Sequence, residues 1–492
     1  MTGPGRARWV VLATLSLAVL MVAIDATVLN LAIPEITRDL DPTSTQLLWI
    51  LDVYSLVLAG LLVSAGTLSD RLGRKRVLLA GCSLFAVASV LAAFAPTAEA
   101  LIAARVLLGI GGATIMPSTL AIIRNVFTDR RERTLAIGVW SAMAAAGAAV
   151  GPIVGGVLLE HFWWGSVFLI NVPVMAVLLV AGVIVIPALP GIATGRWDWP
   201  SAVASMVGLV TLVLAIKTLA HDGLVATFWL YTSVALLVLG WFVRRQVRIP
   251  VPLIDVTLFK RRSFSGAVLA NLLSLSALAG LLLFLSQHLQ LVLSFSPLEA
   301  GIRMLPLTLG ALVGAPLTAT LARRLGTAHT ITLGLALGTL GLTAFAATVD
   351  ANYVFLALSL VGVGAGVGVS LTATSDAILN AAPADHAGAA SSISETAYEL
   401  GTGLGIAIFG SILAALYASN VATVPYLDTA ASQSLAAAIE QATALPEASV
   451  TIALEGARVA FDTALTTTAL IAASLLAITT VVSRLLLRPQ PG

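Results

Sequence analysis

The stretch Gly66–Arg76, which reads Gly-Thr-Leu-Ser-Asp-Arg-Leu-Gly-Arg-Lys-Arg, separates two long apolar segments. Glycine, aspartate and clustered arginines between apolar segments predict a tight cytoplasmic loop that joins two membrane helices. Gly73 permits the turn because glycine adopts backbone angles that other residues avoid. Asp70 follows a helix C-terminus, where the helix dipole disfavours a carboxylate, so we expect it to have another partner.

The composition supports a membrane protein. Of the 492 residues, 59% are hydrophobic and 10% are charged, and the mean hydropathy is +1.01. Soluble proteins contain about 25% charged residues, so this chain has too few polar residues to cover a water-soluble globule. The net charge of +2 gives no reason to expect nucleic-acid binding, and the single cysteine, Cys82, cannot form an intrachain disulfide.

The hydrophobic runs predict an all-α, polytopic protein with fourteen membrane spans, since about 20 apolar residues cross a bilayer. The first run is too long for a signal peptide and is expected to stay as a helix. The spans centre on 9–33, 47–69, 77–95, 98–123, 134–158, 164–186, 200–219, 227–243, 264–293, 297–322, 328–348, 354–380, 388–417 and 459–486.

The basic residues give the expected orientation. With both termini in the cytoplasm, most of the 26 lysines and arginines fall in cytoplasmic segments, as the positive-inside rule requires. The exceptions are Arg38, Arg105, Lys217, Arg303 and Arg458. The segment 418–457 contains acidic residues and no lysine or arginine, so we expect an external loop with a surface helix in its alanine-rich part.

A weak internal repeat divides the chain. Leu68–Gly73 (LSDRLG) follows the second span, and Leu321–Gly326 (LARRLG) follows the tenth. This repeat predicts a six-helix bundle in 1–195, two linker helices in 196–262, and a second six-helix bundle with the long external loop in 263–492.

Four motifs resemble those of the major facilitator superfamily, in its fourteen-helix drug:proton antiporter branch, and most resemble bacterial quaternary-ammonium and dye exporters. They are Ile24–Pro34 in the first span, Gly66–Arg76, Leu101–Gly112 in the fourth span, and Gly147–Gly156 in the fifth. The resemblance implies a fold of two six-helix bundles plus two inserted helices. One departure is Leu108, where many members of the branch carry glutamine.

Two acids near the N-terminus are candidate proton or cation sites. Asp25 lies inside an apolar run, where an ionised carboxylate is strongly disfavoured and the residue can take up a proton. We expect it to face a central cavity, although a structural carboxylate held by neighbouring helices is the alternative. Asp52 is predicted near the outer end of span two, where a solvated rim residue is the alternative. Trp49 and Tyr54 beside it fit either a cation–π surface or an interfacial aromatic belt.

Span thirteen contributes a pair of acids. Glu395 and Glu399 are four residues apart and therefore share one helix face, next to Tyr398. Two adjacent carboxylates cannot both ionise cheaply, so at least one is expected to hold a proton. The resemblance places acids of this helix at the substrate cavity, with Glu395 as the stronger candidate. Trp49, Tyr54 and Tyr398 are the candidate aromatic residues of that cavity.

Arg105 and the glycines of span five are candidates for coupling and gating. Arg105 lies inside span four and needs either a partner or water, unless its side chain snorkels outward. The resemblance assigns it to proton coupling, and assigns conformational gating to Gly66, Asp70, Arg71, Gly73 and Arg74. The small-residue face of span five predicts close helix packing, and consists of Gly147, Gly151, Pro152, Gly155 and Gly156.

These features predict a proton-coupled antiporter of the bacterial cytoplasmic (inner) membrane that exports lipophilic, cationic compounds by alternating access. We expect a monomer whose partners are protons, cargo and the bilayer. No lysine follows glycine in a phosphate-binding motif, and the five histidines are scattered. We therefore expect no enzyme activity, cofactor or metal. The alternatives are an exporter of a single metabolite, amino acid or lipid, and a scaffold or sensor that transports nothing.

Overall fold

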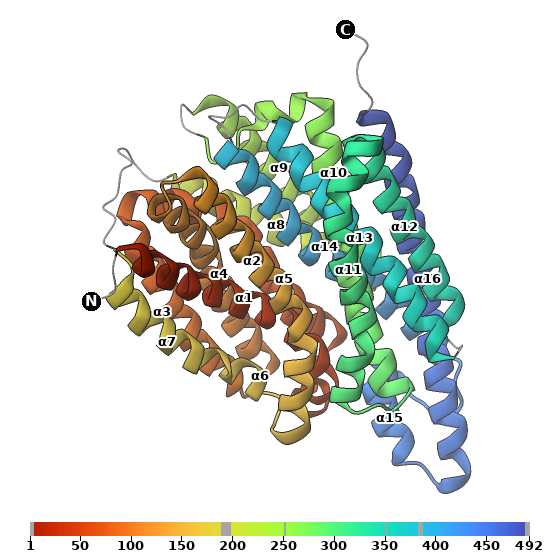
Figure 1. Cartoon of the computed structure of the whole chain (residues 1–492). Helices are drawn as coiled ribbons and strands as arrows, with labels where there is room; N and C mark the ends of the chain where they lie inside the picture. The colour runs from red at the N-terminus through yellow and green to blue at the C-terminus, as the bar shows by residue number, and fades with distance from the viewer. Residues whose placement is uncertain (1–3, 188–197, 250–251, 350–351, 382–386, 488–492) are drawn as a thin grey trace.

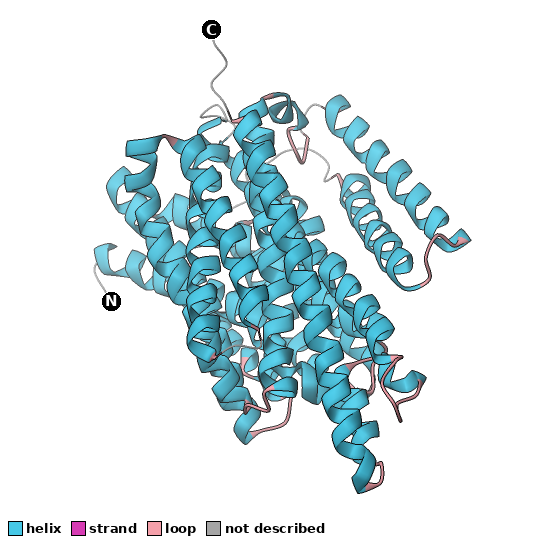
Figure 2. Cartoon of the chain, turned by 90° about the vertical axis from the view of Figure 1, so that its right-hand side faces the viewer, coloured by secondary structure: helices cyan, strands magenta, loops and turns pink. Residues whose placement is uncertain are grey.

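The structure is a computed structural model that describes residues 4–187, 198–249, 252–349, 352–381 and 387–487. Every regular element among these residues is a helix, and the helices run side by side along one direction (Figures 1 and 2). The helices before residue 198 are α1 (Pro4–Leu40), α2 (Ser44–Leu72), α3 (Arg74–Ala93), α4 (Ala98–Val126), α5 (Arg130–His161), α6 (Ser166–Leu169) and α7 (Asn171–Val185).

The remaining helices are α8 (Trp199–His221), α9 (Ala226–Arg248), α10 (Arg262–Gln287), α11 (Pro297–Leu325), α12 (Thr327–Thr348), α13 (Tyr353–Ala381), α14 (Ala387–Val421), α15 (Leu435–Thr443) and α16 (Glu447–Leu486). Short 3₁₀ turns span Val256–Lys260 and Thr429–Ser432, and a π-helical turn spans His288–Val292 after α10.

Thirteen of the described helices are long and apolar enough to cross a membrane. The predicted span 134–158 corresponds to α5, a helix of 32 residues whose described part at Ala146–His161 is apolar. The predicted span 164–186 is interrupted at Ile170, between α6 and α7. The external segment is shorter than expected because α14 continues to Val421 and α16 begins at Glu447, and α15 is the predicted surface helix.

The internal repeat appears as two matching turns. Gly73 ends α2 and starts α3 with a φ of 96°, and Gly326 joins α11 to α12 with a φ of 82°. Such positive φ values strain residues with a side chain. The opposite ends of α2 and α11 also match, because Thr43 with Gln46 and Ser296 with Glu299 form capping boxes.

The helices pack into two groups. In the first bundle α1 packs on α5, α2 and α3 pack on α4, and α3 packs on α7. In the second bundle α13 packs on α11 and α12, and α16 and α10 pack on α12 and α14, respectively. The two bundles meet along α2–α14 and α5–α11, while α8 packs on both α2 and α14. The predicted boundary at 195 lies outside the described residues, so that domain division stays a prediction.

The bundles are in contact at the end of the molecule that carries α15, which we call the loop end. There the Ser286 hydroxyl donates to the Asn30 carbonyl at 2.6 Å, and Gln290 Nε2 donates to the Leu31 carbonyl at 3.2 Å. A Cβ atom at Gly301 would come within 2.5 Å of the Pro152 carbonyl oxygen, so α5 and α11 approach backbone to backbone. The first and second bundles are therefore joined tightly at this end.

Candidate functional site

A buried cluster around Asp25 joins four helices of the first bundle, α1, α3, α4 and α7. The Asp25 carboxylate, 0% exposed, lies 3.1 Å from Arg105 Nη1 on α4 and accepts a 2.7 Å hydrogen bond from Asn171 Nδ2 on α7. Asn171 also donates to Ser89 on α3 at 3.1 Å. The helix break at Ile170 makes Asn171 the first residue of α7, and its polar side chain is thereby turned into the bundle.

The buried guanidinium of Arg105 contacts a carboxylate, a backbone carbonyl and an aromatic ring. Besides Asp25, its Nε donates to the Ile50 carbonyl at 3.1 Å, and its guanidinium carbon lies 4.5 Å from the centre of the Tyr54 ring. The requirement for a partner is confirmed, and the snorkelling alternative is wrong because Arg105 is only 1% exposed. Tyr54 is 1% exposed, and its ring contacts Arg105. It is not among the residues that line the central cavity, contrary to the prediction.

A second buried ion pair connects α2 to α8. Lys217 Nζ lies 3.0 Å from the Asp52 carboxylate and 3.7 Å from the centre of the Trp49 ring. Asp52 is 0% exposed and Lys217 is 4% exposed. Asp52 is therefore not a solvated rim residue, and Trp49 faces Lys217 rather than the central cavity.

A central cavity lies where the two bundles meet, and its lining residues come from α1, α2, α4, α10 and α14. Arg105 and Ser55 from the first bundle and Tyr398 and Glu399 from the second are on its wall. Its other polar lining residues are Thr27, Asn30 and Thr402, and the rest of the wall is apolar. A mostly apolar cavity with few polar groups suits a lipophilic ligand.

The structure corrects which acid faces this cavity. Asp25 is not among the lining residues, whereas its ion-pair partner Arg105 is. Glu399 is a lining residue and is 8% exposed, whereas Glu395, one turn earlier on α14, is half-buried and is not on the wall. Tyr398 lines the cavity as predicted and is 39% exposed.

The charges of the membrane core divide into matched and unmatched groups. Asp25 is matched by Arg105, and Asp52 by Lys217. Among the residues that the structure describes, no cation forms an ion pair with Glu395 or Glu399. Glu399 interacts electrostatically with Glu395 and has a hydrogen bond with Ser55. A buried ion pair is neutral as a unit, whereas two close carboxyls without a cation favour sharing protons.

Two of the residues predicted to act in gating lie at helix contacts, and the gating role itself stays a prediction. Arg74 donates to the Ala121 carbonyl on α4 at 3.2 Å, and Gly66 packs next to Pro117. Arg71 has an interaction partner, and the side chain of Asp70 lies outside the described residues, so its predicted partner is untested.

The small-residue face of α5 packs closely, as predicted. A Cβ at Gly147 or Gly151 would lie 2.5 Å from the Leu20 carbonyl or 2.0 Å from Thr27 Oγ1, both on α1. Gly155 also packs on α1, and Gly156 packs on Leu298 of α11. This face therefore contacts both bundles, and Pro152 lies at the crossing with α11.

Two residues of these sites were missed by the sequence analysis. Asn171 is separated from Asp25 by 146 positions, and Lys217 is separated from Asp52 by 165. The sequence contained a signal for each, because both are polar residues inside apolar runs. Burying such a side chain in the membrane is unfavourable unless it has a partner. The identity of the partner depends on tertiary packing and could not be read from the sequence.

The fold and the buried polar sites define a multi-pass membrane transporter. The chain belongs to the Major Facilitator Superfamily, whose family model matches residues 15–406. It is 46% identical to the multidrug efflux pump LfrA of Mycolicibacterium smegmatis, with 96% of this chain and 94% of that protein covered. It is 40% identical to the methyl viologen resistance protein SmvA of Salmonella typhimurium, with 92% and 93% covered.

Solved structures agree on the fold. A crystal structure of a bacterial homologue of the human lysosomal transporter Spinster, inward-facing and occupied, aligns with a TM-score of 0.70 at 17% sequence identity. The alignment covers 100% of both chains. A nucleoside transporter, NupG, aligns with a TM-score of 0.62 at 14% identity, over 97% of this chain and 100% of that one. At these identities the likeness concerns the fold alone.

Proposed function

We propose that this protein is a proton-coupled antiporter that exports lipophilic, cationic drugs, dyes or antiseptics across the bacterial inner membrane by alternating access. The termini are cytoplasmic in this proposal, and the working unit is a monomer. The observation that carries it is the unmatched pair Glu395 and Glu399, with Glu399 on the wall of an otherwise apolar cavity. An anionic group in such a cavity attracts a cation, and a proton can replace that cation.

The relatives support the class of cargo. Two names describe multidrug efflux and methyl viologen resistance, and methyl viologen is an aromatic dication. The cavity described above offers such a molecule apolar walls, the Tyr398 ring for cation–π contact and a carboxyl group for its charge.

Asp25 and Arg105 offer a second element of coupling. While Asp25 is ionised, it neutralises a guanidinium that lines the cavity. A proton on Asp25 would remove that compensation and leave an excess positive charge beside the cargo. Protonation of Asp25 would then weaken the binding of a cationic cargo by repulsion, although the proton and the cargo bind at different residues. Coupled exchange requires such a difference in binding free energy.

Export from everted membrane vesicles tests the proposal. Vesicles that contain the protein should accumulate methyl viologen when a proton gradient is imposed, and an uncoupler should abolish the accumulation. Glu399→Gln should lose most of this activity. Glu455→Gln, the same change at an exposed position of α16, is the matched control and should not. Accumulation that persists with the uncoupler would remove the proton-coupled mechanism, and absence of any transport would favour a scaffold or sensor.

A dedicated exporter is the second candidate, because other relatives carry the names of single compounds. The tetracenomycin C resistance and export protein of Streptomyces glaucescens is 32% identical over 82% of this chain. Competition separates the two functions. Unrelated lipophilic cations should block methyl viologen export by a polyspecific pump, and a dedicated exporter should ignore them.

A further inference from the structure

The helix α8 lies directly behind the wall of the central cavity. Ser55 of α2 and Thr402 of α14 face the cavity, and Leu56 and Ala407 on the other sides of these helices form a buried cluster with Val213 of α8. Trp49, Leu400 and Leu404 pack against the same cluster. The seam between the first and second bundles is therefore covered by α8 at this place.

The contacts of α8 with the first bundle are polar and close. Near the loop end Lys217 pairs with Asp52 at 3.0 Å, and further along the helix the Ser205 hydroxyl donates to the Gly60 carbonyl at 2.9 Å. A Cβ at Gly60 would come within 2.5 Å of the sulfur of Met206, so α8 fits into a notch on α2. Separating the two helices would expose a buried ammonium and a buried carboxylate, which is strongly unfavourable.

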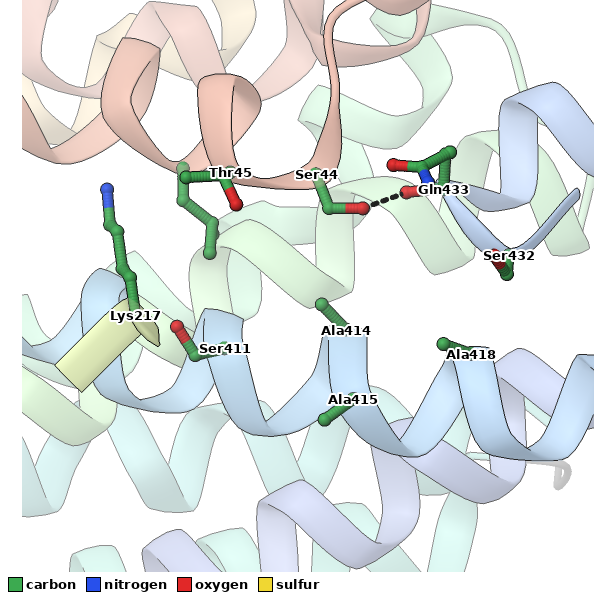
Figure 3. A pocket seen from close by; sticks show the side chains of 10 residues that line it. Ser44, Thr45, Lys217, Ser411, Ala414, Ala415, Ala418, Ser432 and Gln433 are labelled. Atoms are coloured by element: carbon green, nitrogen blue, oxygen red, sulfur yellow. Dashed lines mark hydrogen bonds between the residues drawn. The ribbon is translucent and has the colours of Figure 1, made fainter. Parts of the chain in front are cut away.

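The contacts of α8 with the second bundle are of a different kind. Over the described residues, no hydrogen bond or ion pair connects α8 to α14. Val213 meets Ala407 in an apolar contact, and the hydroxyl of Ser411 on α14, 5% exposed, has no hydrogen-bond partner although it shares a pocket with Lys217. Figure 3 shows the Lys217 side chain rising past Ser411 toward the end of α2 that carries Thr45.

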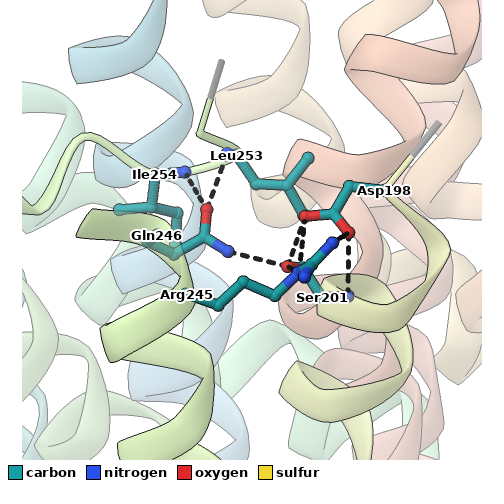
Figure 4. Close-up of polar contacts among 6 residues, drawn as sticks. All are labelled: Asp198, Ser201, Arg245, Gln246, Leu253 and Ile254. Carbon is teal, nitrogen blue, oxygen red and sulfur yellow. Dashed lines mark hydrogen bonds and ion pairs between the residues drawn. The ribbon is translucent and has the colours of Figure 1, made fainter. Parts of the chain in front are cut away.

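The helix α9 is fastened to α8 and contacts few other elements. Arg245 Nη2 lies 2.8 Å from Asp198 at the start of α8, and Gln246 Nε2 donates to the Ser201 hydroxyl at 2.9 Å (Figure 4). Gln246 also accepts hydrogen bonds from the backbone of Leu253 and Ile254, where the chain continues to α10. We call α8 and α9 together the linker pair.

We propose that the linker pair moves with the first bundle during transport, with the Asp52–Lys217 ion pair as its anchor, while its apolar contact with α14 slides. Lys217 is then a positioning residue: it holds α8 on α2 so that the cavity stays sealed from lipid on this side as the bundles rock. An apolar contact between small residues has no directional bonds to break, so it can change register at low cost, whereas the buried ion pair cannot. This proposal depends on the alternating-access part of the proposed function.

Crosslinking in a Cys82→Ser background tests the proposal. One variant carries Gly60→Cys with Met206→Cys, which ties α8 to α2; the other carries Val213→Cys with Ala407→Cys, which ties α8 to α14. Methyl viologen transport is measured before oxidation, after oxidation and after reduction, and crosslink yield is measured by counting free thiols. The α2–α8 crosslink should preserve transport. The α8–α14 crosslink should reduce it by about tenfold or more, and reduction should restore it.

Two results would overturn the proposal: equal loss of transport from both crosslinks, or full transport with the α8–α14 crosslink. Failure of the proposed function gives a different result. In that case the reduced variants and the Cys82→Ser background would already lack uncoupler-sensitive transport. Energy-independent counterflow of methyl viologen would still report whether each crosslink stops the movement.

Discussion

The number of unmatched carboxyls in the core makes a quantitative prediction about Glu395→Gln. If Asp25 stays ionised throughout the cycle and Glu395 and Glu399 both exchange protons, two protons enter for each methyl viologen dication that leaves, and the cycle moves no net charge. With one carboxyl removed, one proton exchanges for the dication. Each cycle then moves one positive charge outward against a membrane potential that is negative inside.

This change has a calculable cost. Moving one elementary charge against 100 mV requires about 2.3 kcal/mol, and about 1.4 kcal/mol corresponds to a factor of ten in an equilibrium ratio. At a fixed pH gradient, raising the voltage from zero to 100 mV should therefore lower the maximum concentration ratio of methyl viologen in Glu395→Gln about 40- to 50-fold. The ratio for the unmodified protein should stay independent of voltage.

Proteoliposomes with a potassium diffusion potential provide the assay. The pH gradient is fixed, the voltage is set between zero and 100 mV with valinomycin, and the steady-state methyl viologen ratio is measured for each variant. The exposed residue Glu455 again supplies the control, because Glu455→Gln should remain independent of voltage. A voltage-dependent ratio in the unmodified protein, or an unchanged voltage response in Glu395→Gln, would refute the assignment of two exchanging carboxyls.

Three further changes test the buried and surface charges. Arg105→Met should lower the free energy of unfolding by about 3–5 kcal/mol because it leaves a buried carboxylate without its partner. Arg8→Met, at a half-exposed ion pair, should lower it by about 0–1 kcal/mol. Equal losses for the two variants in denaturant titrations would contradict this. Asp52→Asn and Lys217→Met should each destabilise the protein more than the double variant does. The double variant should keep the pH profile of export. A changed pH profile would indicate that Asp52 exchanges protons during transport. Hydrogen bonds from Arg245 and Ser201 outweigh the effect of partial burial and keep the pKa of Asp198 below its ordinary value. Its stabilising contribution is therefore present above about pH 4 and lost as the pH falls through the folded pKa, so thermal scans of Asp198→Asn should converge with the unmodified protein in acid.

The sequence predicted the helices well because their signals are local. Runs of about 20 apolar residues and glycine turns mark the spans, and the matching positions of Gly73 and Gly326 confirmed the internal repeat. The break at Ile170 was not predicted, although the polar Asn171 and Pro173 follow it directly within the apolar run 164–186. Where such a run bends depends on what it packs against.

The candidate site was predicted in part for a related physical reason. The residues that act in pairs were found singly: Asp25, Asp52 and Arg105 each stand out as charges in apolar runs. The helix face that a residue occupies relative to the cavity is not visible in a helix that is hydrophobic all round, such as α1. This is why Asp25 was expected on the cavity wall and Glu395 was ranked above Glu399.

The distribution of charge explains why three acids in similar apolar runs need not have the same role. Asp25 and Asp52 face cations that are fixed on neighbouring helices, so a change of protonation there acts on an ion pair and therefore on the position of a helix. Glu399 faces the cavity and has no described ion-pair partner, and it interacts with the carboxyl group of Glu395. A change of protonation there acts on whatever occupies the cavity. Neutralising a paired acid should therefore alter stability and coupling first, whereas neutralising Glu399 should alter the affinity for a cation first.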